Sequence, residues 1–151
     1  MELGTSLGIT TAYLAKACPD ATVYTLEGCP ELSRLAMDTF KKAGAENVKP
    51  VTGEFGQKLF GLLRKTGKAD MVYLDGNHEY SAVMEYFSLI SKHLHAGSVF
   101  ILDDIRWSKG MWKAWKALQD VPAKTLSLDL GKLGIVFFDP RLSRENLVIW
   151  F

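Results

Sequence analysis

The residues with the clearest chemical potential open the chain, in a turn of small side chains. Gly4-Thr5-Ser6-Leu7-Gly8 follows an apolar strand end and precedes a helix-like segment. Small residues let backbone N–H groups approach a ligand closely, and the N-terminus of the following helix favours a negatively charged group. The Gly-x-Ser-x-Gly spacing is tighter than Gly-x-Gly-x-x-Gly, so it favours a nucleoside-type ligand without a pyrophosphate over a dinucleotide.

Glu27 is the second candidate for ligand binding. It ends the next strand-like run of the chain, where a carboxylate can accept two hydrogen bonds from vicinal ribose hydroxyls. Taken alone, it could equally be a solvated acid at a strand end. The glycine turn upstream favours the ribose interpretation.

Three further carboxylates follow apolar runs. Asp75 comes after Val72-Tyr73-Leu74, and Asp103 and Asp104 come after Phe100-Ile101-Leu102. Grouped carboxylates repel one another unless a cation compensates them, and oxygen-rich clusters suit a hard divalent cation such as Mg²⁺. The alternative is that these aspartates cap the helices that follow. Spacing alone leaves both interpretations open.

His78 and Trp107 are candidates for contact with a second substrate. His78 follows Asp75 by three residues and could take a proton from an acceptor hydroxyl, because its unperturbed pKa lies near neutrality. It could also merely shape the loop. Trp107 stands close to the acidic pair and could line an acceptor pocket, whereas Trp112 and Trp115 at helical spacing predict packing.

An alternation of strands and helices must position these residues. The apolar patterns predict strands at 22–26, 48–52, 71–74, 98–102, 124–128 and 134–138, and another at 147–151. They predict helices at 9–17, 30–43, 55–65, 79–94 and 108–119. Such alternation implies a parallel α/β sheet with helices on both faces, whose ligands bind at the carboxyl ends of the strands. The connection before 134–138 is too short for a helix, so this strand should pair antiparallel with 124–128.

Composition restricts the class of protein. The 48% hydrophobic and 23% charged fractions are typical of one globular domain. A net charge of +1 gives no reason to expect nucleic acid or a membrane as partner, and no apolar run approaches the ~20 residues of a membrane span. Cys18 and Cys29 are expected to be buried or half-buried free thiols in a reducing compartment, which fits a cytoplasmic location.

The ordered set of motifs resembles class I S-adenosylmethionine-dependent methyltransferases. It is most similar to the small O-methyltransferase-like branch that includes the catechol O-methyltransferase type, and the likeness runs from Glu2 to about Phe138. The resemblance implies one domain over residues 1–151 with a Rossmann-like, doubly wound, mostly parallel seven-stranded sheet, in the order 3-2-1-4-5-7-6 with an antiparallel last pair.

The resemblance also implies an activity and a set of site residues. The activity is methyl transfer to a small-molecule acceptor, with a hydroxyl oxygen favoured and with Mg²⁺ or another divalent cation as an optional aid. The implied cofactor-binding residues are Glu2, Gly4, Thr5, Ser6, Gly8, Thr10, Glu27, Gly28, Gly53, Glu54, Phe55 and Asp75. The implied metal ligands are Asp75, Asp103 and Asp104, and the implied catalytic residues are His78 and Asp75.

Two positions depart from the family pattern. His78 stands where the metal-dependent members carry a catalytic lysine, and Asp104 stands where the catechol type has asparagine. The second change makes the expected metal site more negative. The expected partners are the acceptor and, as one option, a second copy of the chain.

The first strand is expected to be unusually short, since only Met1–Leu3 precede the turn. In the implied order this strand is central, and each buried backbone group left without a partner would cost about 1–3 kcal/mol. Three explanations are compatible with the sequence. The chain is a fragment of a longer protein; it is a truncated product that lacks the family's upstream helices and is catalytically weak; or a partner chain or the terminal strand 147–151 supplies the pairing.

Two rival functions follow from the same residues. One is a domain that binds S-adenosylmethionine without turnover. The other is a nicotinamide-dependent oxidoreductase, which the short glycine turn and the acidic residues at 75, 103 and 104 disfavour.

Overall fold

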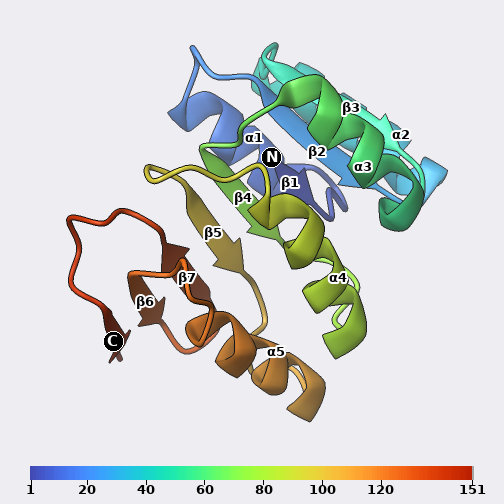
Figure 1. Ribbon diagram of the computed structural model, residues 1–151. Coiled ribbons are helices and arrows are strands. Elements are labelled where there is room, and N and C mark those ends of the chain that lie inside the picture. The colour runs from blue at the N-terminus through green and yellow to red at the C-terminus, as the bar shows by residue number, and fades with distance from the viewer. Residues whose placement is uncertain (151) are drawn as a thin grey trace. The chain divides into compact units, whose positions relative to one another are not determined.

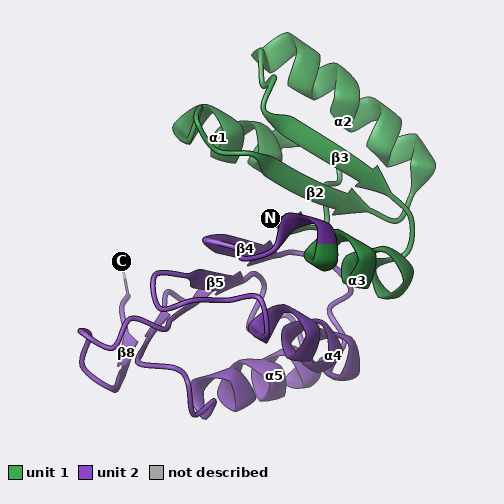
Figure 2. Ribbon diagram, turned by 45° about the horizontal axis from the view of Figure 1, so that its top comes forward, with its two compact units in different colours: residues 1–64 green, residues 65–151 purple. Residues whose placement is uncertain are grey.

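The computed structural model describes residues 1–150 and contains two compact units, Met1–Arg64 and Lys65–Phe151 (Figures 1 and 2). Its helices are α1 (Ile9–Ala17), α2 (Pro30–Ala43), α3 (Phe55–Thr66), α4 (Tyr80–Ser91) and α5 (Lys109–Gln119). Its strands are β1 (Glu2–Leu3), β2 (Val23–Glu27), β3 (Val48–Thr52), β4 (Met71–Leu74), β5 (Val99–Leu102), β6 (Leu126–Asp129), β7 (Gly134–Phe137) and β8 (Glu145–Val148).

The first unit contains a parallel sheet with β2 between β1 and β3. All five residues of β2 pair with β3, from Val23 opposite Val48 to Glu27 opposite Thr52. Only two residues pair β1 with β2, namely Glu2 opposite Thr25 and Leu3 opposite Leu26. The backbone N–H groups of Gly4 and Thr5 extend this contact, because both donate to the Leu26 carbonyl at 2.9 and 3.2 Å.

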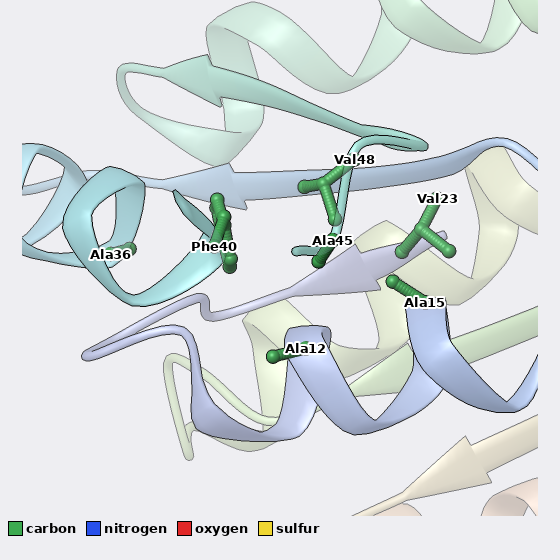
Figure 3. Packing of buried hydrophobic residues seen from close by; sticks show 7 residues of the cluster. All are labelled: Ala12, Ala15, Val23, Ala36, Phe40, Ala45 and Val48. Carbon is green, nitrogen blue, oxygen red and sulfur yellow. The ribbon is translucent and has the colours of Figure 1, made fainter. Parts of the chain in front are cut away.

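Small side chains pack α1 and α2 against this sheet. Ala12 and Ala15 of α1 and Ala36 of α2 are buried in one cluster with Phe40, Val23, Ala45 and Val48 (Figure 3). Alanine at these positions lets the helices come close, and Phe40 fills the remaining space. The turn from α2 to β3 is tied down by Asn47, whose amide donates to the carbonyls of Ala15 and Ala21 at 3.1 and 2.8 Å.

The second unit contains a mixed sheet. β4 and β5 are parallel, β7 is antiparallel to both β5 and β6, and β8 is parallel to β6. The strand orders β3-β2-β1 in the first unit and β4-β5-β7-β6 in the second both agree with the predicted order 3-2-1-4-5-7-6. β8 adds one strand beyond β6. β6 and β7, which a short turn connects, pair antiparallel, as the length of this connection predicted.

Aromatic side chains dominate the interior of the second unit. Phe87 of α4 and Phe100 of β5 meet edge to face with ring centroids 5.1 Å apart. Trp115 of α5 is fully buried against β7, where a Cβ on Gly134 would lie 2.5 Å from the indole ring. Glycine is therefore required at this position for the helix to approach the sheet.

Five predicted elements are shifted by one residue at one or both ends, and three others differ by more. The helix predicted at 79–94 ends at Ser91, because the N–H of His93 turns back to the Ile90 carbonyl. The strand predicted at 124–128 begins at Leu126, since the N–H of Lys124 closes a turn onto Val121. The terminal strand lies at Glu145–Val148 and pairs with β6, so it does not supply a partner for β1, and position 151 lies outside the described residues.

Two smaller observations complete the description. Cys29 is half-buried as expected, but Cys18 is exposed, because it follows the last residue of α1 at the surface. Within residues 1–150, none of the helices combines the length and the apolar character that crossing a membrane requires.

Candidate functional site

The turn after β1 is built from residues with left-handed backbone angles. Gly4, Ser6 and Gly8 have φ values of 103°, 49° and 77°. Gly8 is the N-cap of α1, and a Cβ there would lie 2.6 Å from Cε1 of Phe40 and 3.0 Å from the Ala36 side chain. The predicted need for glycine thus has two causes at this position: the backbone angle and the approach of α2.

Glu27 holds this turn next to the end of β2. Its Oε2 accepts from the Ser6 N–H at 2.8 Å, and its Oε1 accepts from the Cys29 N–H at 2.9 Å. The Glu27 carbonyl in turn accepts from the Gly53 N–H at 2.8 Å. The ends of β1, β2 and β3 are therefore joined through one residue, and its half-buried carboxylate keeps free acceptor positions for a hydroxylated ligand.

Two of the predicted cofactor-binding residues point away from the surface. Glu2 is fully buried, and its Oε2 accepts from the hydroxyl groups of Thr11 and, at 2.5 Å, Thr25. The hydroxyl of Thr5 lies 2.6 Å from that of Thr25. Glu2 and Thr5 therefore support the turn from inside the unit.

Five other predicted cofactor-binding residues of the first unit are accessible. Thr10 and Phe55 are half-buried and Glu54 is exposed. Nothing lies within 4 Å of a Cβ built on Gly28, so there is open space beside it. Gly53 has a φ of 135°, which again favours glycine.

A second group of predicted site residues meets in the second unit. Single ligand atoms of Asp75, His78 and Asp104 all lie within 4.8 Å of one another. Nε2 of His78 is 4.0 Å from Asp75 Oδ1 and 3.9 Å from Asp104 Oδ2. We call these three residues the acidic cluster. Two carboxylates and an imidazole form a donor set that fits a divalent cation such as Mn²⁺ or Mg²⁺.

Asp103, the third predicted ligand, lies beside this cluster. It is 5% exposed, its Oδ2 accepts from the Tyr73 hydroxyl at 2.5 Å, and its Oδ1 accepts from the Asp104 N–H at 2.7 Å. The second bond supports Asp104 in a left-handed conformation with φ 53°. Asp103 thus orients Asp104, while the donor atoms that come together are those of Asp75, His78 and Asp104.

Helix capping does not account for these aspartates. The N-cap of α5 is Ser108, whose hydroxyl accepts from the Met111 N–H at 3.0 Å. The N-cap of α4 is Glu79. The sequence left helix capping and metal binding open for Asp75 and Asp104. The structure shows these two residues grouped with His78 and not at the N-cap of a helix.

The electrostatics of the cluster are those of crowded acids. Burial raises the pKa of Asp75, and the charges of Asp103 and Asp104 raise it further, while His78 opposes them. A cation reaches the group from the turn between β6 and β7. Nζ of Lys132 lies 3.5 Å from Asp104 and 3.7 Å from Asp103, and these two charges raise the pKa of Lys132.

An exposed indole stands next to the cluster. Trp107 is 72% exposed, and its ring centroid is 6.0 Å from that of His78. The tryptophans of α5 were expected to be packing residues; Trp115 is fully buried, whereas Trp112 is 40% exposed and stacks on the Arg106 guanidinium at 4.9 Å.

Sequence reasoning missed Lys132 and Tyr73. Tyr73 sits inside an apolar strand, so its hydroxyl carried no distinct signal. Lys132 is one lysine among many, and only the hairpin turn between two strands that are distant from Asp104 in the sequence brings it to the acids. Ser6, Asn77 and Asp104, the non-glycine residues with positive φ in the described chain, all follow strands that lead to a predicted site. Such strain is concentrated at functional sites.

Comparison with known proteins agrees with this geometry. A family model described as a methyltransferase domain matches residues 1–105. A probable O-methyltransferase of Mycobacterium tuberculosis is 31% identical over 115 residues, which are 70% of this chain and 48% of that protein. The chain thus spans about half the length of this relative.

Solved structures share the fold. The chain is similar to an O-methyltransferase from Bacillus cereus in complex with S-adenosylhomocysteine, with a TM-score of 0.73 and 20% identity over 90% of this chain and 72% of that one. It is also similar to a methyltransferase from Podospora anserina bound to S-adenosylhomocysteine, with a TM-score of 0.77 and 19% identity over 91% of this chain and 70% of that one.

Proposed function

The chain belongs to the methyltransferase-domain family, and from this premise we propose that it transfers the methyl group of S-adenosylmethionine to a hydroxyl oxygen of a small molecule. The observation that carries the proposal is the turn after β1, where Glu27 accepts from the Ser6 N–H at 2.8 Å. This contact supports the proposal, because it joins the backbone of the turn to a carboxylate that could also accept from ribose hydroxyls.

In this proposal the first unit binds the nucleoside. Gly4, Ser6 and Gly8 provide a turn without bulky side chains, and Thr10 lies in the first turn of α1, where the helix N-terminus favours a carboxylate. Glu27 accepts hydrogen bonds from the ribose hydroxyls. Gly53, the exposed Glu54 and Phe55, which follow β3, would border the base, and the open space at Gly28 lies after β2.

The second unit provides the groups that act on the acceptor. Asp75 and Asp104 would hold a divalent cation through their oxygens, with Asp103 and Tyr73 keeping Asp104 in place. A cation bound there would lower the pKa of an acceptor hydroxyl and orient its oxygen. The exposed face of Trp107 offers an apolar surface on which a flat acceptor could lie.

In this proposal His78 is the general base that takes the proton of the acceptor hydroxyl. As the acceptor oxygen attacks the methyl carbon, a C–O bond forms, the C–S bond breaks, and the hydroxyl proton passes to Nε2 of His78. This nitrogen lies 4.0 Å from Asp75 and 3.9 Å from Asp104, next to the carboxylates that would hold the cation and so near the hydroxyl that the cation would orient. His78→Asn tests this assignment: we expect about a hundredfold loss in kcat and less than a threefold change in Mn²⁺ affinity. A loss of tenfold or more in Mn²⁺ affinity would make His78 a metal ligand instead.

Partners and location belong to the same proposal. A net charge of +1 supports a small-molecule acceptor over nucleic acid. We place the protein in the cytoplasm, and sedimentation of the purified chain would show whether it forms a homodimer.

Calorimetric titration with S-adenosylhomocysteine is the test of the proposed function. We expect binding in the micromolar range by the wild type, and no effect of Mn²⁺ removal on the number of sites. Absence of binding by a folded sample would contradict the proposal. A matched titration with NAD⁺ should give no heat, and NAD⁺ binding would favour an oxidoreductase.

A further inference from the structure

Lys132 reaches the aspartates from a different part of the second unit. It lies in the turn between β6 and β7, and its Nζ is 3.5 Å from Asp104 Oδ1 and 3.7 Å from Asp103 Oδ1. Its side chain is 69% exposed, so neighbouring side chains do not pack it into this position. The ammonium therefore stays near the carboxylates through charge attraction and through the placement of its backbone.

That backbone is fixed to the loop that carries the two acids. The Ile105 N–H donates to the Lys132 carbonyl at 3.0 Å. Arg106 donates to the Gly131 carbonyl and to both oxygens of the buried Asp129, the latter at 2.6 and 2.8 Å. Bidentate pairs of this kind restrict orientation as well as distance. Arg106 is thus a positioning residue for the turn that carries Lys132.

Aromatic stacking holds Arg106 itself. Its guanidinium carbon lies 4.9 Å from the Trp112 ring centroid and 5.1 Å from that of Trp150. The Trp115 indole N–H adds a bond of 3.3 Å to Asp129. The turn is therefore held from both sides, and Lys132 begins close to the acids before any ligand arrives.

Asp104 is shared between this ammonium and the acidic cluster. Its Oδ1 faces Lys132, while its Oδ2 faces His78 at 3.9 Å. A divalent cation that enters between Asp75, His78 and Asp104 would meet the positive charge of Lys132 a few ångströms away. Like charges at such a distance repel, and the repulsion is weakened but not abolished by partial exposure.

We propose that Lys132 is the resident counter-cation of the acidic cluster, and that it competes with a divalent cation for Asp104 and so keeps the affinity of this site low. The inference rests on the proposed function, because it concerns the cation that would assist methyl transfer. A weakly held cation exchanges readily with solvent. Lys132 would then offset part of the negative charge of the neighbouring carboxylates when no metal is bound.

Titration of Mn²⁺ into metal-free protein by calorimetry tests the proposal. We expect Lys132→Met to bind Mn²⁺ about tenfold more tightly than the wild type, as removal of one nearby positive charge predicts. Lys132→Arg keeps the charge and should bind within about twofold of the wild type. Lys92→Met is the matched control: it removes an exposed lysine at the other end of α4 from His78, and its Mn²⁺ affinity should not change.

The opposite results overturn the proposal. Equal or weaker Mn²⁺ binding by Lys132→Met would do so, as would the absence of Mn²⁺ binding from both proteins at millimolar concentration. Titration of the same samples with S-adenosylhomocysteine separates the two hypotheses. If that ligand binds the wild type while Lys132→Met leaves Mn²⁺ affinity unchanged, only the role of Lys132 fails. If the wild type does not bind it, the proposed function fails.

Discussion

The turn after β1 and the acidic cluster are two sites built on different principles. In the turn, backbone N–H groups and left-handed residues define the geometry, and the Glu27 carboxylate at the end of β2 is already paired with the Ser6 N–H of the turn and with the Cys29 N–H. In the cluster, side chains define the geometry, and Lys132 offsets only part of the negative charge of the carboxylates. The first site should therefore depend on shape and the second on charge.

The largest expected effect is that of filling space at the turn. Gly8→Ala puts a Cβ 2.6 Å from Phe40 and forces alanine to a φ of 77°. We expect a loss of about 3 kcal/mol in the free energy of unfolding, together with loss of S-adenosylhomocysteine binding. Denaturant unfolding measures the first. Gly28→Ala is the control, because nothing lies within 4 Å of its Cβ, and it should change stability by less than about 0.5 kcal/mol. Equal losses of unfolding free energy in Gly8→Ala and Gly28→Ala would contradict the dependence of the turn on shape.

The next effect concerns the ion pair between Arg106 and Asp129, which holds the turn that carries Lys132. Asp129→Asn breaks the bidentate pair with Arg106 and leaves a guanidinium without its partner, so we expect a loss of about 2 kcal/mol in unfolding free energy at pH 7. Burial raises the pKa of Asp129, but the bonds from Arg106 and the Gly131 N–H lower it further, so its net pKa lies below the usual value.

The pH dependence of that loss has a defined sign. A lowered pKa contributes stability above the unfolded value of about 3.9, and this contribution disappears as the pH falls through the folded value. The difference between wild type and Asp129→Asn should therefore shrink on acidification below pH about 4. Unfolding curves between pH 7 and pH 3 measure it, and a difference that stays constant over this range would exclude the ion pair as its source.

A smaller effect is expected at Glu27, whose carboxylate contacts the turn from the end of β2. Glu27→Gln places an amide NH₂ where an oxygen now accepts from the Ser6 or Cys29 N–H. We expect S-adenosylhomocysteine to bind about tenfold more weakly, because the turn must move and one ribose acceptor is lost. Calorimetry measures this change. Glu31→Gln removes an exposed acid in the first turn of α2 and should leave the affinity unchanged.

The smallest effect compares the left-handed residues of the two sites. Ser6→Gly and Asp104→Gly both relieve a positive φ, of 49° and 53°. Ser6→Gly should change the unfolding free energy by less than about 1 kcal/mol and keep Mn²⁺ affinity. Asp104→Gly should change stability as little but weaken Mn²⁺ binding. Weaker Mn²⁺ binding in both variants would contradict the separation of shape and charge.

Most of the residues in these predictions lie within the range that the family model matches. The family match covers residues 1–105, which include the turn, Glu27, Asp75 and both Asp103 and Asp104. The turn that carries Lys132 lies outside this matched range.

The local sequence determined the alternation of elements and the turn at Gly4–Gly8. Hydrophobic periodicity and glycine spacing act over a few residues, so α1, α2 and β3 begin and end where the pattern predicted. The antiparallel pairing of β6 with β7 followed from a short connection. The position of β8 depended on its pairing with the distant strand β6, and the end of α4 depended on a local turn that the apolar pattern did not reveal, so the predicted bounds of both were displaced.

Only the tertiary structure decided how the charged residues meet. Sequence analysis listed Asp75, Asp103, Asp104 and His78, but packing placed Asp103 against Tyr73, brought His78 between the other two acids, and added Lys132 from a distant hairpin. It also buried Glu2 beneath the turn. Backbone geometry is encoded within a few neighbouring residues, whereas the environment of a side chain is set by segments far apart in the chain.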